Sequence, residues 1–177
     1  MTILRHTGGM AAHLDEVDRK ILRALQSNAR TSNSEIARQL NMAPSAILER
    51  IRKLEARGII TGYEARLAPK EMGLGMVAFI SVRTRDRSDA DDLEARLAKL
   101  PEVLDIHCVA GEDCYLVKAR VADVDALRVL VHDKIGALDA VMGTRTTVVM
   151  GTIKETLKLP VGPVEVSSSL AQRVLRA

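Results

Sequence analysis

Three short amphipathic patterns follow one another before residue 60, and each has its own start signal. Asp15 can cap the first helix, and Pro44 suits the first turn of the third. Ser32 and Glu35 have the spacing of a capping box at the start of the second, and Gly58 ends the third. The apolar positions at helical spacing are Val17, Ile21, Leu22 and Leu25, then Ile36, Ala37 and Leu40, then Ile47, Leu48, Ile51 and Leu54. Helices this short need tertiary packing, so the three must bury their apolar sides against one another.

Two short helices joined by a brief turn and braced by a first helix form the helix-turn-helix arrangement. The helix from Pro44 to Arg57 would be the second of the pair, with small residues near its start and cations further along. Small residues let the backbone approach a groove of double-stranded DNA, and cations can reach phosphates or guanine edges. The candidate DNA-binding residues are Ser32, Asn33, Ser45, Ala46, Glu49, Arg50, Arg52, Lys53 and Arg57. The alternative is a three-helix scaffold with a solvated charged face, on which Glu49 and Lys53 merely stabilise the helix.

The charge of the chain is divided unevenly between its two halves. The net charge is +3, but residues 1–68 contain 11 Lys and Arg against 7 Asp and Glu, whereas residues 69–156 contain 12 against 15. A basic front and an acidic middle suggest two modules with different partners. Between them, apolar residues from Ile59 to Leu67 predict a strand pair or wing.

Residues 75–151 contain two similar strand–helix–strand patterns. Strands are expected over residues 75–85, 103–109, 115–121 and 144–150, with helices that bury Leu93, Leu97 and Leu100, and then Val124, Leu127, Val131 and Ile135. This order predicts the ferredoxin-like βαββαβ fold, in the α+β class. Helices on one face leave the other face of the sheet bare, and a domain of ~75 residues buries only about 60% of its unfolded surface. We therefore expect a homodimer that pairs sheet face against sheet face.

Five segments result from these patterns. They are a tail over residues 1–13, a winged helix-turn-helix DNA-binding domain over 14–62, a hinge strand over 63–74, a ferredoxin-like domain for ligand binding and oligomerisation over 75–156, and a second tail over 157–177.

The turn between the second and third expected strands is a candidate ligand site. A glycine beside two carboxylates, Gly111-Glu112-Asp113, offers free backbone N–H groups and negative charge. These could receive the carboxylate and the ammonium group of an amino acid. The alternative is an ordinary acidic hairpin turn.

The composition and motifs disfavour several other classes. No apolar run reaches the ~18 residues that a membrane span needs, and residues 1–13 lack a secretory signal, so we expect a cytoplasmic protein without a membrane partner. Aromatic residues make up only 2%, which disfavours single-strand nucleic-acid binding by stacking. His107, Cys108 and Cys114 match no zinc spacing, and no catalytic triad, phosphate loop or dinucleotide fingerprint is present. We therefore expect no catalytic residue, metal or cofactor.

Three stretches resemble the leucine-responsive regulatory protein / AsnC family of bacterial and archaeal transcription regulators. They run from Leu14 to Leu22, from Leu25 to Arg30 and from Arg50 to Tyr63, and the resemblance extends over about residues 14–160. It implies a sequence-specific transcriptional regulator whose dimers assemble into tetramers or octamers. It also implies that a small effector, usually an amino acid, shifts the balance between assemblies with different DNA affinity.

The resemblance implies an effector pocket between dimers, formed by the acidic turn and the fourth strand. The residues carried over are Gly111, Glu112, Asp113, Cys114, Thr144, Thr146 and Thr147. The chain departs from the family at Cys114, where many members have an acid for the ligand's ammonium group, so Asp113 or Glu112 would have to substitute. A second departure is Ala43, where a serine commonly caps the third helix; its loss should weaken the cap by ~1 kcal/mol.

Two alternatives share this architecture. Some proteins that resemble the family are haem-pathway decarboxylases that bind a tetrapyrrole in a large pocket lined by His or Arg, for which this chain offers His107 and Arg145. The other is a regulatory subunit that binds amino acids and keeps only vestigial DNA contacts.

Overall fold

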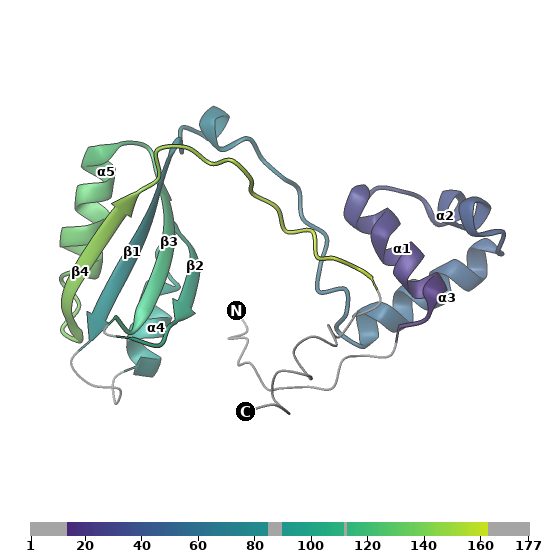
Figure 1. The fold of residues 1–177 in the computed structure, drawn as a ribbon, viewed down its shortest axis with the longest axis horizontal. Coiled ribbons are helices and arrows are strands. Elements are labelled where there is room, and N and C mark those ends of the chain that lie inside the picture. The colour runs from purple at the N-terminus through teal and green to yellow at the C-terminus, as the bar shows by residue number, and fades with distance from the viewer. Residues whose placement is uncertain (1–13, 85–89, 112, 163–177) are drawn as a thin grey trace, which may run out of the picture. The chain divides into compact units, whose positions relative to one another are not determined.

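The computed structural model describes residues 14–84, 90–111 and 113–162 (Figure 1). The chain forms two compact units: the first contains the described residues up to Glu64 and again from Thr156, and the second contains Ala65–Glu155. The described residues from Thr156 on, which include the start of the tail expected over 157–177, group with the first unit. The expected tail over 1–13 and the last residues, 163–177, lie outside the described residues.

The first unit contains the three expected helices, α1 (Glu16–Ser27), α2 (Asn33–Leu40) and α3 (Pro44–Ala56). The Asp15 carboxylate caps α1 by accepting a hydrogen bond from the N–H of Asp18 at 2.7 Å. Ser32 Oγ caps α2 by accepting from the N–H of Glu35 at 3.2 Å. Asn41 ends α2 in the left-handed conformation, which asparagine tolerates better than most residues.

The start of α3 has no side-chain cap. Ala43 occupies the N-cap position in extended conformation and has no hydroxyl to accept a hydrogen bond, while Pro44 fills the first helical position. The three helices share one core, whose buried residues are Ile21, Leu22, Ile36, Ala37, Ile47, Ile51 and Leu54. The predicted trihelical packing is therefore confirmed.

The residues expected to form a strand pair or wing after α3, and the hinge strand expected over 63–74, form no strand in the described chain. Gly58 turns the chain with φ of +67°, but residues 59–68 form no strand, and a 3₁₀ helix, η1 (Pro69–Met72), follows. Alternating apolar residues predict an extended backbone, yet a strand also requires a hydrogen-bonded neighbour. Residues 59–68 have no such neighbour in the described parts of the chain.

The second unit is a four-stranded antiparallel sheet with helices on one face, which confirms the predicted ferredoxin-like fold (Figure 1). Its strands are β1 (Met76–Thr84), β2 (Val103–Cys108), β3 (Tyr115–Val121) and β4 (Val141–Val148), in the order β2-β3-β1-β4. Helix α4 (Ala90–Leu97) follows β1, and α5 (Val124–Arg128) follows β3. Strand β4 begins three residues before the prediction, because Val141 pairs with Thr84 beyond a register shift.

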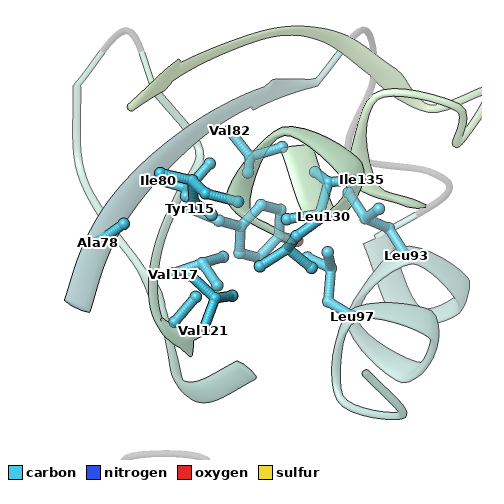
Figure 2. Packing of buried hydrophobic residues seen from close by; sticks show 12 residues of the cluster. Ala78, Ile80, Val82, Leu93, Leu97, Tyr115, Val117, Val121, Leu130 and Ile135 are labelled. Carbon is cyan, nitrogen blue, oxygen red and sulfur yellow. The ribbon is translucent and has the colours of Figure 1, made fainter. Parts of the chain in front are cut away.

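The helix-facing side of the sheet forms the core of the second unit. Tyr115 is 4% exposed and lies between sheet and helices (Figure 2). Its hydroxyl donates to Glu94 Oε1 at 3.0 Å. The buried cluster also contains Ala78, Ile80, Val82, Leu93, Leu97, Val117, Ala119, Val121, Leu127, Leu130 and Ile135. Burial removes water from the Tyr115 hydroxyl and, with the nearby Glu94 carboxylate, raises its pKa to about 12.

The second helix of this unit departs from the predicted α-helical pattern. After α5 the chain continues as a π-helix, η2 (Val129–Ile135), which ends with a bond from the N–H of Gly136 to the carbonyl of Val131 at 2.8 Å. Leu130 is fully buried, and Val131, which was expected in the core, is partly buried and packs against it. Val124, also expected in the core, is 66% exposed.

The opposite face of the sheet contributes no residue to the core cluster. Residues directly opposite one another in antiparallel strands point to the same face. The register therefore aligns one row on the open face, His107, Leu116, Ser81 and Arg145, and a second row, Asp105, Lys118, Phe79 and Thr147. We name these eight residues the open sheet face.

Candidate nucleic-acid interface and effector site

One side of α3 faces solvent along its whole length. Ile47, Ile51 and Leu54 are buried in the helical core, and the polar residues lie on the other side. Among the predicted DNA-binding residues from Ser45 to Arg57, Ser45, Glu49, Arg52, Lys53 and Arg57 are exposed and Ala46 is half-buried beside them. This set combines small side chains near the N-terminus with three cations further along. Such a surface suits the major groove of DNA. Small residues at the N-terminal end let the helix come close to the base edges, and the cations can contact phosphates.

Glu49 and Lys53 form an ion pair on this surface. Lys53 Nζ lies 2.7 Å from Glu49 Oε1, and the two side chains are 67% and 69% exposed for Glu49 and Lys53. The hydrogen bond from Lys53 lowers the pKa of Glu49. Because exposed pairs contribute little to stability, Lys53 can leave Glu49 for a phosphate at small expense in free energy.

Arg50 is placed differently from the other cations of α3. Its Nη1 atom lies 2.7 Å from Asp15 Oδ2 and 2.7 Å from Asp18 Oδ1, at the start of α1. The two carboxylates raise the pKa of Arg50 further, and the Asp18 N–H and Arg50 together lower the pKa of Asp15. The guanidinium thus joins α3 to α1. The sequence pattern placed Arg50 among the DNA-binding cations and did not predict this contact. The signal available in the sequence was the pair of aspartates at the start of the first helix.

A hollow of about 350 Å³ lies beside α3 in the first unit. Its lining residues are Asp18, Met42, Ala46, Glu49, Arg50, Lys53, Leu54 and Arg57. Two carboxylates and three cations line it, so the hollow has no single sign of charge.

Ser32 and Asn33 lie at the N-terminal end of α2. The Ser32 hydroxyl oxygen is engaged as the helix cap, and Asn33 is the first helical residue. The N-terminus of a helix favours a phosphate, so this end of α2 remains a candidate for a backbone contact. A DNA contact of Ser32 or Asn33 stays a prediction.

The acidic turn and β4 meet at one end of the sheet. Arg145 Nη2 lies 2.6 Å from Asp113 Oδ2, and the Asp113 side chain is 24% exposed while that of Arg145 is 74% exposed. Gly111 has φ of +136°, a conformation that side-chain-bearing residues rarely adopt. Glu112 lies outside the described residues. The predicted effector residues include Thr144 and Thr146 but not Arg145, which lies between them.

Cys114 is held in place at the same end of the sheet. Its N–H donates to the carbonyl of Val82 at 3.0 Å, and the Thr84 hydroxyl lies 3.1 Å from its Sγ. Thr144 pairs with Val82 from the other side of β1, which brings it to the same end. Two strand positions further on, Thr146 shares its face of β4, but Thr147 belongs to the open sheet face. The three threonines therefore do not line one surface.

The described residues contain no group of three or more His, Cys, Asp or Glu side chains placed to hold a metal ion. Cys108 is exposed and Cys114 half-buried, and neither forms a disulfide. In the parts of the chain that the structure describes, no helix combines the length and the apolar character needed to cross a bilayer.

Both units match known protein families. Residues 14–61 match the family model described as winged helix-turn-helix DNA-binding, and residues 77–159 match the Lrp/AsnC ligand binding domain. The leucine-responsive regulatory protein of Salmonella typhimurium is 38% identical over 149 residues, which cover 82% of this chain and 90% of that protein. This relative is named as a regulatory protein and not as a decarboxylase, so the comparison does not support the haem-pathway decarboxylase alternative.

Solved structures resemble the chain closely. A transcriptional regulator from Neisseria meningitidis, in complex with L-Met, is 37% identical with a TM-score of 0.80, covering 84% of this chain and 97% of that one. AsnC of E. coli is 31% identical with a TM-score of 0.77, covering 81% and 96%. A feast or famine regulatory protein of M. tuberculosis, complexed with L-methionine, is 35% identical with a TM-score of 0.76, covering 83% and 99%.

Proposed function

The chain belongs to the Lrp/AsnC family of transcriptional regulators, and from this premise we propose that it reads double-stranded DNA with α3 and responds to an amino acid at the Asp113 end of its sheet. The observation that supports DNA reading best is the exposed side of α3, with small residues at its start and cations along it. The proposed function includes no catalytic step.

The DNA-reading surface comprises Ser45, Ala46, Glu49, Arg52 and Lys53, with Arg57 at its end. Ser45 and Ala46 admit the backbone to the groove, and Arg52 and Lys53 supply charge for phosphates or guanine edges. Arg50 acts from behind this surface, because its ion pairs with α1 fix the angle at which α3 is presented.

The open sheet face supports a homodimer. Leu116 and Phe79 lie at its centre, with Lys118 and His107 beside them. A second copy would bury these apolar side chains, which the helices of the same unit do not cover. The dimer presents two α3 helices, and a pair can enter successive major grooves ~34 Å apart. Dimers of this kind would assemble further into tetramers or octamers.

The effector site rests on the Asp113–Arg145 ion pair. An amino acid carries both an ammonium and a carboxylate group, so it can replace this exposed pair by placing its ammonium on Asp113 and its carboxylate on Arg145. Cys114 cannot take the ammonium, because a neutral thiol offers no charge and its sulfur already contacts Thr84. The L-Met complexes of two similar structures make L-Met the first ligand to test.

A thermal-shift titration tests the effector site. The wild-type midpoint should rise with L-Met concentration as mass action requires, and N-acetyl-L-methionine and L-methioninamide, which each lack one charge, should raise it much less. Asp113→Asn should abolish the L-Met response, whereas the matched change Asp139→Asn, at an exposed residue without an ion pair in the described chain, should leave it intact. If none of the twenty amino acids raises the midpoint, the effector site is refuted.

In vitro selection tests DNA reading. The full-length protein, incubated with a library of random duplexes, should enrich a sequence with two related half-sites about 10 base pairs apart, or a multiple of that distance. Recovery of duplexes without any enriched sequence would contradict sequence-specific recognition.

A further inference from the structure

The segment Thr156–Val161 is held against α1 by a side-chain amide that hydrogen-bonds to both the N–H and the carbonyl of one of its residues. Gln26 Nε2 donates to the carbonyl oxygen of Leu159 at 3.1 Å, and the N–H of Leu159 donates to Gln26 Oε1 at 2.6 Å. The amide of Gln26 therefore satisfies both backbone groups of one residue, as a neighbouring strand would. We call residues 156–161 the return segment.

Two further contacts secure the return segment to the first unit. Arg23 Nε donates to the carbonyl oxygen of Val161 at 2.9 Å, while its Nη1 lies 3.4 Å from Glu16 Oε1. The Val161 side chain packs against the buried core of the three helices. The segment thus contributes backbone hydrogen bonds and apolar contact, although Leu159 itself is 74% exposed.

The residue just before the return segment is fastened within the second unit. Glu155 Oε2 accepts a hydrogen bond from Arg120 Nη2 at 3.1 Å, and Glu155 Oε1 pairs with Lys118. The carbonyl of Glu155 accepts from Arg66 Nη2 at 3.3 Å. Only residues 156–158 separate this anchor from Leu159, so a short span of chain joins the two fastened points.

From these contacts, and resting on the proposed function, we propose that Gln26 is a positioning residue for DNA binding. By holding Leu159 it gives the DNA-reading unit a second, short tether besides the chain that leaves α3. When one α3 of a dimer is bound, the effective concentration of the other at its half-site depends on tether length and stiffness. Release of Leu159 would leave the chain between α3 and Arg66 as the single tether and lower that concentration without altering α3.

Two duplexes separate this role from a merely structural one. The first is the paired-site duplex recovered by selection with the wild-type protein, and the second has one half-site scrambled. Gln26→Ala in the full-length chain should weaken binding to the paired-site duplex by about tenfold and change binding to the single-site duplex less than about twofold. Alanine is the best helix former, so α1 should persist in this variant.

A second variant acts on the return segment itself. Leu159→Pro removes the N–H that donates to Gln26 Oε1, so it should weaken binding to the paired-site duplex, as Gln26→Ala does. Leu157→Pro is the matched control, because Leu157 is 80% exposed and its N–H has no partner among the described residues. Hydrogen exchange adds a direct readout: the Leu159 amide should be protected in the wild type and lose protection in Gln26→Ala.

The outcomes are distinct. Loss confined to the paired-site duplex, together with loss of Leu159 protection, supports the proposal. Equal loss on both duplexes, or unchanged binding after Leu159 loses its protection, overturns it. A wild-type protein that binds no duplex refutes the proposed function instead, which is a separate result.

Discussion

Arg50 and Asp18 are joined by an ion pair 2.7 Å long between Nη1 and Oδ1, in which the Asp18 side chain is only 13% exposed. The same nitrogen also pairs with Asp15, so one guanidinium bridges the start of α1 and the middle of α3. Arg50 therefore contributes to the packing of α1 against α3, whether or not DNA is bound.

Arg50→Ala should therefore lower stability. It leaves two carboxylates without their cation, and a decrease of about 1 kcal/mol in the free energy of unfolding is expected, since the pair is partly exposed. Chemical denaturation of the full-length protein measures this value. Arg52→Ala is the control, because Arg52 is exposed and makes no ion pair within the described residues. Equal stability of Arg50→Ala and the wild type would contradict the bridging role.

Ala43→Ser should stabilise the first unit. Ala43 has the extended backbone of an N-cap residue, with φ of −71° and ψ of 139°, but no side-chain oxygen. A serine hydroxyl at this position can accept from a free N–H of the first turn of α3, which typically contributes about 0.5–1 kcal/mol. Ala56→Ser, at the other end of the helix, should not stabilise the protein. A thermal midpoint of Ala43→Ser at or below that of the wild type would show that the first turn is satisfied without a cap.

The stability of the first unit should fall in acid through Asp15. Its pKa is lowered from 3.8 by the hydrogen bond from the Asp18 N–H and by Arg50, so the folded state binds fewer protons than the unfolded state. The stabilisation is complete above the unfolded value and is lost as the pH falls through the folded pKa. Asp15→Asn keeps a good cap but cannot ionise, so its stability gap to the wild type should narrow below about pH 4. Denaturation curves at several pH values measure the gap, and a gap independent of pH would contradict the prediction.

Leu116→Glu should disrupt the dimer. Leu116 lies on the open sheet face between His107 and Ser81, where a second copy would bury it. A carboxylate at this position would have to be desolvated on pairing, which strongly disfavours association. Light scattering after size exclusion should give a lower mass than for the wild type. Val124→Glu, a similar change at an exposed residue of α5, should leave the mass unchanged. Identical masses for wild type and Leu116→Glu would place the interface elsewhere.

Local signals in the sequence predicted most of the fold. Caps at Asp15 and Ser32 are both formed as the pattern indicates, because capping depends on neighbours a few residues away. The strand pair predicted after Ile59 does not form, because alternating apolar residues give no information on whether a strand to pair with exists. Leu130 is fully buried and Val131 only partly, and the region is wound as a π-helix, whereas the prediction assumed 3.6 residues per turn throughout.

The candidate site was predictable in part. Exposure of Glu49 and Lys53 follows from helical periodicity, since Ile47, Ile51 and Leu54 must face the core. The roles of Arg50 and Arg145 do not follow from it, because each depends on a carboxylate at least 32 residues away along the chain. Such pairs are visible only once the helices and strands are packed.

The salt dependence of DNA binding tests the central claim most directly. With the selected duplex, log Kd should rise linearly with log salt concentration, and Lys53→Ala should reduce the slope by about 0.9 for the phosphate contact it removes. Lys99→Ala, which removes the same charge from an exposed residue of the second unit, should leave slope and affinity unchanged. Identical slopes for the wild type and Lys53→Ala, or equal losses in both variants, would show that the exposed side of α3 does not lie against DNA.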